Sequence, residues 1–284
     1  MDNCVIMEQD LIQIAERLLL NGTLTECPGL VQGKTGIAIF FFHYAKHTNN
    51  TLFADYAMDL IVRIQSQLHF NSPADYAGGI AGIGVGLDYL VRNNLLEAEA
   101  DIFEDLDQRM YRAVIYEPRY NFSLLEGLTG YGKYWISRLR REPSSLSAED
   151  CLRKITEEIE KNRWDIPLEE QTEVYCFLHD LLEYLDLDIS VDLLEQFRRQ
   201  IVNSKSAFSY LSDSAVGNLI RKYQYDRYFS EVPQNKTHQD FFQIPDFEKE
   251  NTSVNMGLLT GCAGDGLLRL TALDQTNELW MQLF

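Results

Sequence analysis

Four short stretches decide the fold of this chain: Gly33-Lys-Thr-Gly36-Ile-Ala38, Gly79-Ile-Ala-Gly82-Ile-Gly84, Gly127-Leu-Thr-Gly130-Tyr-Gly132 and Gly261-Cys-Ala-Gly264-Asp-Gly266. They share the pattern Gly-x-Thr/Ala-Gly-x-Gly/Ala, which is called the glycine motif below. The first three copies begin 46 and 48 residues apart. The gap before the last copy has room for two degenerate copies, which the spacing assigns to residues 173–176 and 214–217. Six units of about 47 residues therefore account for the chain.

Each unit is predicted to form two helices. The glycine motif opens an apolar helix, as in the second unit, where apolar or small residues recur at helical spacing: Ile83, Gly86, Leu87 and Leu90. Amphipathic segments follow at residues 51–68, 95–116 and 147–164, the last opened by the capping pair Ser147 and Asp150. Apolar helices that alternate with amphipathic ones indicate an all-α fold with an inner and an outer ring. We expect one domain over residues 1–284, an α/α toroid of six helical hairpins.

The recurring glycines favour a closed ring and suggest where a ligand binds. An open solenoid needs polar end repeats, whereas the first and last units here carry the same apolar glycine helix. Glycine is unfavourable inside a helix, so its recurrence needs a reason: we expect it to allow positive φ on entry to the helix and close approach of neighbouring backbones. Inner-helix N-termini that converge at one rim would present free amides and positive dipole ends. The sequence therefore predicts a ligand site at this rim.

Composition excludes several classes of protein. The 284 residues carry a net charge of −18, which repels nucleic acid, and no uncharged apolar stretch is long enough to cross a membrane. The first ten residues are acidic, unlike a secretory signal. The five cysteines are odd in number and widely spaced, which favours free thiols in a reducing compartment. We expect a soluble, cytoplasmic protein.

One segment departs from the repeat, at about residues 224–253. It replaces the expected outer helix with a stretch rich in aromatic residues that contains two prolines and shows little helical periodicity. A loop of this length inside a compact domain is usually functional. We predict an irregular insertion here that folds over the rim or contacts a partner.

Residues 78–90, 123–136 and 253–270 resemble the lanthionine synthetase C-like family. The resemblance covers about four of the six units and implies an α/α toroid. Catalytic members of that family are zinc enzymes that add a cysteine thiol to a dehydrated Ser or Thr of a precursor peptide, forming a thioether ring. It also implies that the zinc ligands lie just before the glycine motif, in Trp-Cys-Tyr-Gly and Cys-His-Gly sequences.

The zinc ligands that the resemblance implies are missing from this sequence. The residues directly before each motif are Gln32, Gly78, Glu126, Thr172, Asp213 and Thr260. One place earlier stand Val31, Ala77, Leu125, Gln171, Ser212 and Leu259. None is Cys or His, so no zinc cofactor is expected at the rim. Other residues with ligand chemistry are more often core residues by their spacing and surroundings: Cys176 with His179, His43 with His47, and Cys262.

Two carboxylates are the candidates for catalysis or ligand contact. Asp75 lies four residues before Gly79, a place where Asp recurs in the family, and Ser123 occupies that place in the third unit. Glu126 directly precedes Gly127 and would face the same rim. The alternative role of Asp75 is to cap its helix. The remaining candidate ligand contacts at the rim are Gly79, Gly82, Gly127, Gly130, Asp213, Gly261 and Gly264.

Three functions remain open. The first is a zinc-free relative of the thioether cyclases that binds a precursor peptide or assists a peptide-modifying enzyme. The second is an active cyclase with atypical metal ligands. The third is a carbohydrate-active enzyme on the same fold, with Asp75 and Glu126, or Asp213 and Asp265, as its paired carboxylates. The sequence favours the first.

Overall fold

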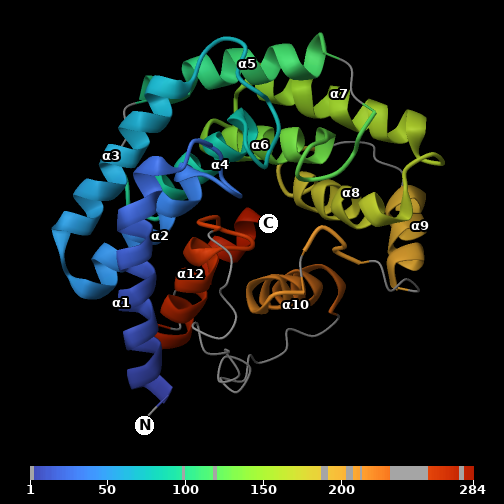
Figure 1. Ribbon diagram of the computed structural model, residues 1–284. Helices are drawn as coiled ribbons and strands as arrows, with labels where there is room; N and C mark the ends of the chain where they lie inside the picture. The colour runs from blue at the N-terminus through green and yellow to red at the C-terminus, as the bar shows by residue number, and fades with distance from the viewer. Residues whose placement is uncertain are drawn as a thin grey trace. The chain divides into compact units, whose positions relative to one another are not determined.

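The computed structural model describes residues 3–97, 100–117, 120–186, 191–202, 207–211, 213–230, 255–274 and 278–284. These residues form eleven α-helices and no strand, which confirms the predicted all-α class (Figure 1). The α-helices are α1 (Asn3–Asn21), α2 (Lys34–Thr48), α3 (Thr51–Gln67), α4 (Ile80–Arg92), α5 (Glu104–Ile115), α6 (Leu128–Arg141), α7 (Leu146–Asn162), α8 (Leu168–Leu181), α9 (Val191–Val202), α10 (Ala215–Phe229) and α12 (Cys262–Leu273). Short 3-10 helices cover Gly22–Leu24, Ala100–Phe103 and Leu279–Leu283.

The chain groups into two compact units. The first comprises residues 1–69, 89–97 and 211–284, and the second comprises residues 70–88 and 98–210. Helices α1, α2, α3, α10 and α12 belong to the first unit, and α5 to α9 belong to the second. Helix α4 contributes residues to both. Each unit is described by itself below.

In the first unit, the apolar helices α2 and α12 pack against each other, and each also contacts an amphipathic helix. Helix α3 lies beside α2, and α1 lies beside α12 (Figure 1). The side chains of Phe40 and Phe41 on α2 are fully buried, and each such burial stabilises the fold by about 1.5–3 kcal/mol. A buried ion pair joins α1 to α12, with Arg269 Nε 2.9 Å from the carboxylate of Asp10. Because α2 and α12 contact each other, the first and last glycine helices are neighbours.

In the second unit, α6 packs against both α7 and α8, and α8 packs against α9. Nearly every residue of α6 is buried, including Trp135, whereas α7 buries only one face. The alternation of nearly fully buried and one-sided helices agrees with the alternation that the sequence predicted. Helix α6 is nevertheless not apolar all round, because its buried residues include Ser137 and Arg138, and Arg138 pairs with Asp107.

The ends of the outer helices differ in detail from the sequence predictions. Helix α3 matches the predicted segment to within one residue. Helix α5 begins only at Glu104, because the earlier part of the predicted segment contains the 3-10 helix Ala100–Phe103. The predicted capping pair of α7 is wrong: the helix begins at Leu146, and its N-cap is Ser145.

The predicted irregular insertion at residues 224–253 is wrong at its N-terminal end. Residues 224–229 continue helix α10, which ends at Phe229. Gln224 is buried there, and its side chain donates a hydrogen bond to the Met281 carbonyl. The rest of the predicted insertion, residues 231–253, lies outside the described residues. Among the described helices, none combines the length and apolar character needed to traverse a lipid bilayer.

Candidate functional site

The loop before each glycine helix folds back onto the helix N-terminus. In all four clear copies, the amide directly after the first glycine donates to the carbonyl six residues before that glycine. The donor and acceptor pairs are Lys34 and Cys27 at 2.9 Å, Ile80 and Pro73 at 2.9 Å, Leu128 and Asn121 at 2.9 Å, and Cys262 and Asn255 at 3.0 Å. The prediction that these N-termini present free amides to a ligand is therefore wrong for the first amide of each helix. The chain's own carbonyls satisfy it.

Close approach of the backbone, and not positive φ, explains the glycines. Gly33 and Gly261 are both extended, with φ of −127° and −145°, and no described glycine has positive φ. A methyl group at either residue would lie 2.5 Å from the carbonyl oxygen six residues earlier. At Gly130 and Gly264 a methyl group would come closer still to the loop carbonyl. Only a residue without a side chain leaves room for the returning loop.

In three of the four motifs, the last glycine accommodates an aromatic ring from the next glycine helix. Gly266 faces Phe40, Gly84 faces Tyr134, and Gly132 faces Phe177. Phe40 and Tyr134 each follow the first glycine of their own motif by seven residues. By the same count, Phe177 places the start of the fourth motif at Glu170.

The predicted register of the fourth unit, which began at residue 173, is therefore shifted by three residues. The motif reads Glu170-Gln-Thr172-Glu173-Val-Tyr175, with glutamates at both glycine positions and Thr172 at the Thr/Ala position. Its helix, α8, begins at Leu168, before the motif, whereas α2, α4, α6 and α12 begin directly after the first glycine. The two residues before the motif become Leu168 and Glu169. Neither is a Cys or a His.

The same hydrogen bond between neighbouring loops occurs at two of the junctions. Leu258 donates its amide to the Val31 carbonyl at 2.7 Å, and Tyr76 donates to the Leu125 carbonyl at 3.0 Å. Both donors stand three residues before their first glycine, and both acceptors stand two residues before theirs. In both places the bond ties a loop to the loop of the next glycine helix.

In the fourth copy a glutamate replaces the loop carbonyl. The amide of Leu124, which occupies the donor position, donates to the carboxylate of Glu173. Glu170 accepts the Phe122 amide at 2.8 Å in the same way. Glu173 is buried, and loss of hydration raises its pKa from 4.5 to about 8, with a further contribution from the negative charge of Glu170. The sequence signal for this arrangement was Thr172, together with the aromatic residue five places after it.

The candidate residues Asp75 and Glu126 lie on neighbouring loops of the second unit. The amides of Tyr76 and Ala77, directly after Asp75, both donate to Leu125, directly before Glu126. Asp75 is half-buried and accepts the Gly78 amide at 2.8 Å, so it stabilises the turn before the helix. Glu126 is exposed. The structure thus brings the two loops together, and a role in catalysis stays a prediction.

The other predicted rim residues divide between the two units. Gly79, Gly82, Gly127 and Gly130 belong to the second unit with Asp75 and Glu126, whereas Asp213, Gly261 and Gly264 belong to the first. These glycines are buried under their loops, so they shape the backbone and offer little surface to a ligand. The Asp213 side chain is exposed and lies 3.6 Å from the Arg221 guanidinium.

Comparison with known families agrees with these junctions. The family model described as lanthionine synthetase C-like protein matches residues 27–176. The chain belongs to the lanthionine synthetase C-like family. The matched region begins at the residue whose carbonyl caps α2 and ends within α8, so it contains the first three glycine helices and part of the fourth. A search of curated proteins found no sequence match.

The zinc ion that this family implies does not fit the residues at the glycine junctions. A zinc site needs deprotonated thiolate or neutral imidazole ligands, and none of the residues before the six motifs provides one. Cys262 lies inside the sixth motif, but it is fully buried, and loss of hydration raises the pKa of its thiol. Burial therefore favours the protonated thiol, which is a poor zinc ligand.

The histidine pair on α2 does not form a ligand pair. His43 is buried, and its Nε2 lies 2.7 Å from the Tyr89 hydroxyl. Burial lowers the pKa of His43 from 6.5 to about 4. His47 instead lies 3.2 Å from the carboxylate of Glu8 on α1. The two imidazoles thus serve different contacts within the first unit.

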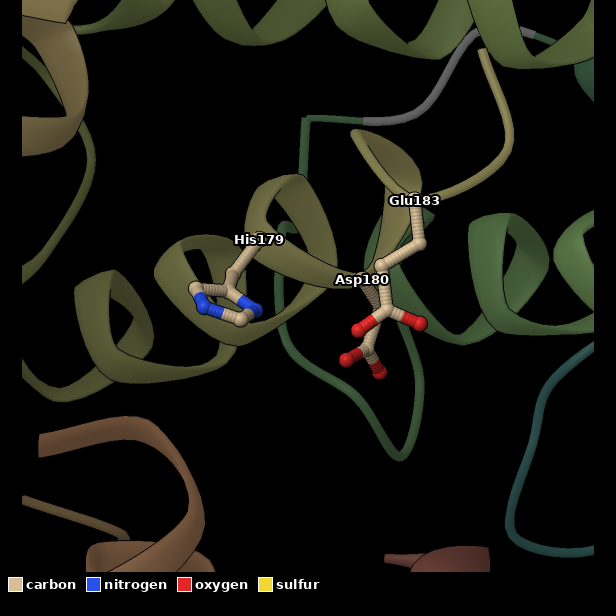
Figure 2. Close-up of side chains that lie close together, drawn as sticks. All are labelled: His179, Asp180 and Glu183. Atoms are coloured by element: carbon tan, nitrogen blue, oxygen red, sulfur yellow. The ribbon is translucent and has the colours of Figure 1, made fainter.

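One group with metal-ligand chemistry lies at the C-terminal end of α8 in the second unit. His179, Asp180 and Glu183 each offer one ligand atom, and these atoms lie within 4.8 Å of one another (Figure 2). The ligand set joins His179 to two carboxylates and does not include Cys176, the partner that the sequence suggested. One imidazole and two carboxylates suit a divalent cation of intermediate hardness. The group lies about 14 Å along α8 from Glu170, at the opposite end from the glycine junction.

Proposed function

We propose that this protein is a zinc-free member of the lanthionine synthetase C-like family that binds a precursor peptide or assists a peptide-modifying enzyme. One observation carries the proposal. The glycine junctions are built as four copies of one geometry, yet the two residues before each motif include no Cys or His. The scaffold is retained, whereas the groups that would hold a Lewis-acidic zinc ion against a substrate thiolate are not.

We further propose that the helices form a closed α/α toroid over residues 1–284. Two contacts in the first unit support closure: α12 packs against α2, and α1 packs against α12. The first and last glycine helices of an open solenoid would lie far apart. The N-terminal helix takes the place of an outer helix for the last glycine helix, which makes the ends of the chain interdependent.

Side chains of the junction loops, and not helix amides, would contact the peptide. Asp75 and Glu126 are the best candidates, because their loops are joined by hydrogen bonds to Leu125. A carboxylate pair can accept hydrogen bonds from peptide amides and from Ser or Thr hydroxyls. The acidic balance of the whole chain favours a peptide that is not itself acidic.

A cyclase with atypical ligands is the second candidate, and the group formed by His179, Asp180 and Glu183 is the observation that favours it. This group has the ligand types for a cation. It lies at the wrong end of its helix for the junction chemistry, so we rank it below the zinc-free function.

Peptide binding tests the proposal. The probe is a fluorescein-labelled peptide rich in Ser, Thr and Cys, taken from a short reading frame beside the gene, with its Ser and Thr residues dehydrated. We expect saturable binding that weakens at least about fivefold in Asp75→Asn/Glu126→Gln, a loss of about 1 kcal/mol. The matched control, Glu157→Gln/Glu160→Gln, removes two exposed acids from α7 and should bind normally.

The same peptide distinguishes binding from catalysis. Thioether formation consumes the cysteine thiol without changing the peptide mass, so alkylation of the remaining thiol with iodoacetamide reports the reaction. We expect iodoacetamide to alkylate the cysteine thiol completely, even after the peptide has been incubated with the protein and zinc. Loss of the thiol at a rate proportional to the protein concentration would establish a cyclase and overturn the zinc-free function. Unchanged binding by Asp75→Asn/Glu126→Gln would exclude the junction as the peptide site.

A further inference from the structure

A hollow of about 860 Å³ lies on the second unit, away from the glycine junctions. It is lined by residues of α5, the C-terminal end of α6 and the start of α7, together with Phe70 from the segment after α3. Along α6, this hollow is about 20 Å from Gly127. Its volume lies in the upper part of the range typical of ligand sites. The hollow is therefore larger than the space that a single side chain needs. We call it the α5–α7 groove.

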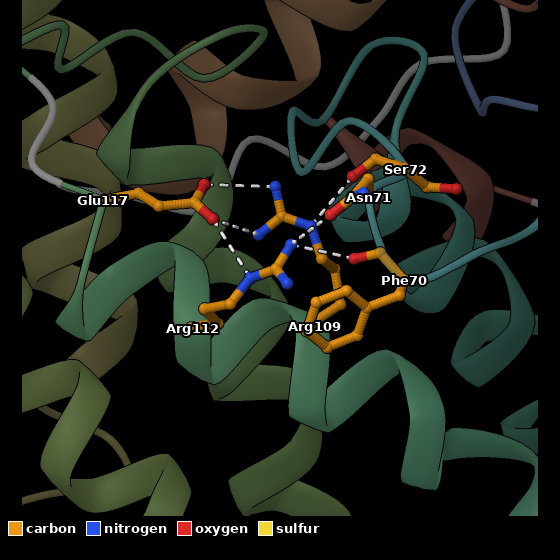
Figure 3. Close-up of polar contacts among 6 residues, drawn as sticks. All are labelled: Phe70, Asn71, Ser72, Arg109, Arg112 and Glu117. Atoms are coloured by element: carbon orange, nitrogen blue, oxygen red, sulfur yellow. Dashed lines mark hydrogen bonds and ion pairs between the residues drawn. The ribbon is translucent and has the colours of Figure 1, made fainter.

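Both arginines that line the groove are already held by carboxylates, and Arg112 shares Glu117 with Arg109, which donates to it at 3.1 and 3.2 Å. Arg112 donates to the carboxylate of Glu117 at 3.2 Å and to the Phe70 carbonyl at 2.8 Å (Figure 3). Arg138 donates two hydrogen bonds of 2.9 Å to the carboxylate of Asp107. Because both guanidinium groups are held by carboxylates of the same unit, they contribute little attraction for an anionic ligand.

Two further carboxylates give the groove its charge. Glu104, at the start of α5, and Glu142, directly after α6, are both exposed and line the groove. Neither forms an ion pair among the residues that the structure describes. Asp107 cancels Arg138, whereas Glu117 is shared by Arg109 and Arg112 and offsets only one of them. The charged side chains that line the groove are three carboxylates (Glu104, Asp107 and Glu142) and two guanidinium groups (Arg112 and Arg138), so the lining keeps a net charge of −1.

Aromatic rings stand beside these carboxylates. Phe70 and Tyr116 are 68% and 69% exposed, which is high for such large apolar side chains, and both line the groove. Tyr111 also lines it, and its ring packs edge-on against Tyr116. Aromatic faces and carboxylates together recognise organic cations, because the ring face attracts positive charge and the carboxylate pairs with it. Arg112 already makes such a contact, with its guanidinium carbon 3.8 Å from the centre of the Phe70 ring.

We infer that the α5–α7 groove binds a segment of a peptide that carries lysine or arginine side chains. The positive charge of the occupant follows from Glu104, Glu142 and the exposed rings alone. That the occupant is a peptide rests on the proposed function, and the volume of the groove agrees with a segment of several residues. The net charge of −18 would speed the encounter with such a peptide, and the groove would give it a place to bind.

The experiment compares two charge-matched double variants of the full chain. Binding of fluorescein-labelled hexalysine is followed by fluorescence anisotropy for the wild type, for Glu104→Gln/Glu142→Gln, and for Glu157→Gln/Glu160→Gln on the exposed face of α7. Both variants remove the same charge from exposed positions of the same unit, so they change the general field equally. We expect a loss of affinity of at least fivefold for the groove variant and less than twofold for the control. Tyr116→Ser, which removes one ring, should weaken binding two- to fivefold.

Each other outcome overturns the inference. Equal losses in the two double variants would mean that hexalysine senses only the overall charge. Equal affinity in the wild type and the groove variant, or the absence of saturable binding, would show that the groove does not bind a cationic segment. If spermine displaces hexalysine at the same concentration, the ligand of the groove would be a free polyamine and not a peptide. None of these results depends on the glycine junctions, so the proposed function at Asp75 and Glu126 can fail or hold independently.

Discussion

The sixth and fourth glycine helices, α12 and α8, make the contact between neighbouring loops in two different ways. At the sixth, Leu258 donates its amide to a carbonyl of the next loop, and Gly264 leaves room for the Leu258 carbonyl. At the fourth, the helix begins earlier, both glycines are glutamates, and the Glu173 carboxylate takes the amide of the preceding loop. The contact between neighbouring loops is retained, although the chemical group that makes it has changed. The junction is therefore a structural connection first, which explains how it persists without zinc ligands.

Gly264→Ala is expected to have the largest effect of the substitutions that separate the two kinds of junction. The added methyl group meets the Leu258 backbone oxygen, which cannot move without breaking the bond from Leu258 to Val31. We expect the free energy of unfolding to fall by at least about 3 kcal/mol, measured by urea denaturation. The equivalent change in the fourth copy, Glu173→Ala, adds no clash and should cost less, about 1–3 kcal/mol for the lost acceptor. An equal or smaller loss in Gly264→Ala would contradict the packing role of the glycine.

Glu173→Gln is expected to change the pH dependence of stability. The pKa of Glu173 is about 8 in the folded state and close to 4.5 when unfolded, so stability falls as pH rises between these values. Below pH 4.5 the carboxyl is protonated in both states, and above about 8 the wild type holds a buried charge. Glutamine keeps an acceptor for Leu124 without titrating.

The variant should therefore match the wild type near pH 4 and exceed its free energy of unfolding by on the order of 5 kcal/mol near pH 9. Thermal denaturation at several pH values measures this difference. A difference that does not depend on pH, or a variant that is less stable than the wild type above pH 8, would show that Glu173 is not buried as a protonated acid.

Asp75→Ser is expected to have the smallest effect, because it turns the second loop into a copy of the third. Ser123 occupies the equivalent position and accepts the Glu126 amide at 3.4 Å, as Asp75 accepts the Gly78 amide. We expect the free energy of unfolding to change by less than about 0.5 kcal/mol. A loss above about 2 kcal/mol would mean that Asp75 stabilises more than its own turn. Unchanged stability with weakened peptide binding would separate the structural role of Asp75 from its proposed functional role.

Many of the helices could be predicted from the sequence, because their positions depend on local periodicity. The glycine motif located α2, α4, α6 and α12, and the amphipathic stripe located α3 to within one residue. The register of the fourth copy was missed because the glycines that mark the others are absent there. Thr172 and Phe177, at the Thr and aromatic positions of the motif, were the signals that could have corrected it.

Contacts between distant segments could not be predicted in the same way. Nothing in residues 3–21 indicates that Asp10 pairs with Arg269, since the two are 259 positions apart. The return of each loop onto its helix was missed for a related reason. The free amides at a helix N-terminus look available in the sequence, and only the loop conformation shows that the carbonyls of Cys27, Pro73, Asn121 and Asn255 occupy them.

The zinc content of the purified protein tests the central claim most directly. The wild type and His179→Gln/Glu183→Gln are equilibrated with zinc, passed through a desalting column, and analysed by elemental mass spectrometry. The account predicts that neither protein retains stoichiometric zinc, because the junctions contain no Cys or His to hold it. About one zinc ion per chain in the wild type that is lost in the variant would contradict the zinc-free function and favour the second candidate, with the ion at His179, Asp180 and Glu183. About one zinc ion per chain that persists in the variant would also contradict the account, since the protein would then contain a metal site that uses neither His179 nor Glu183.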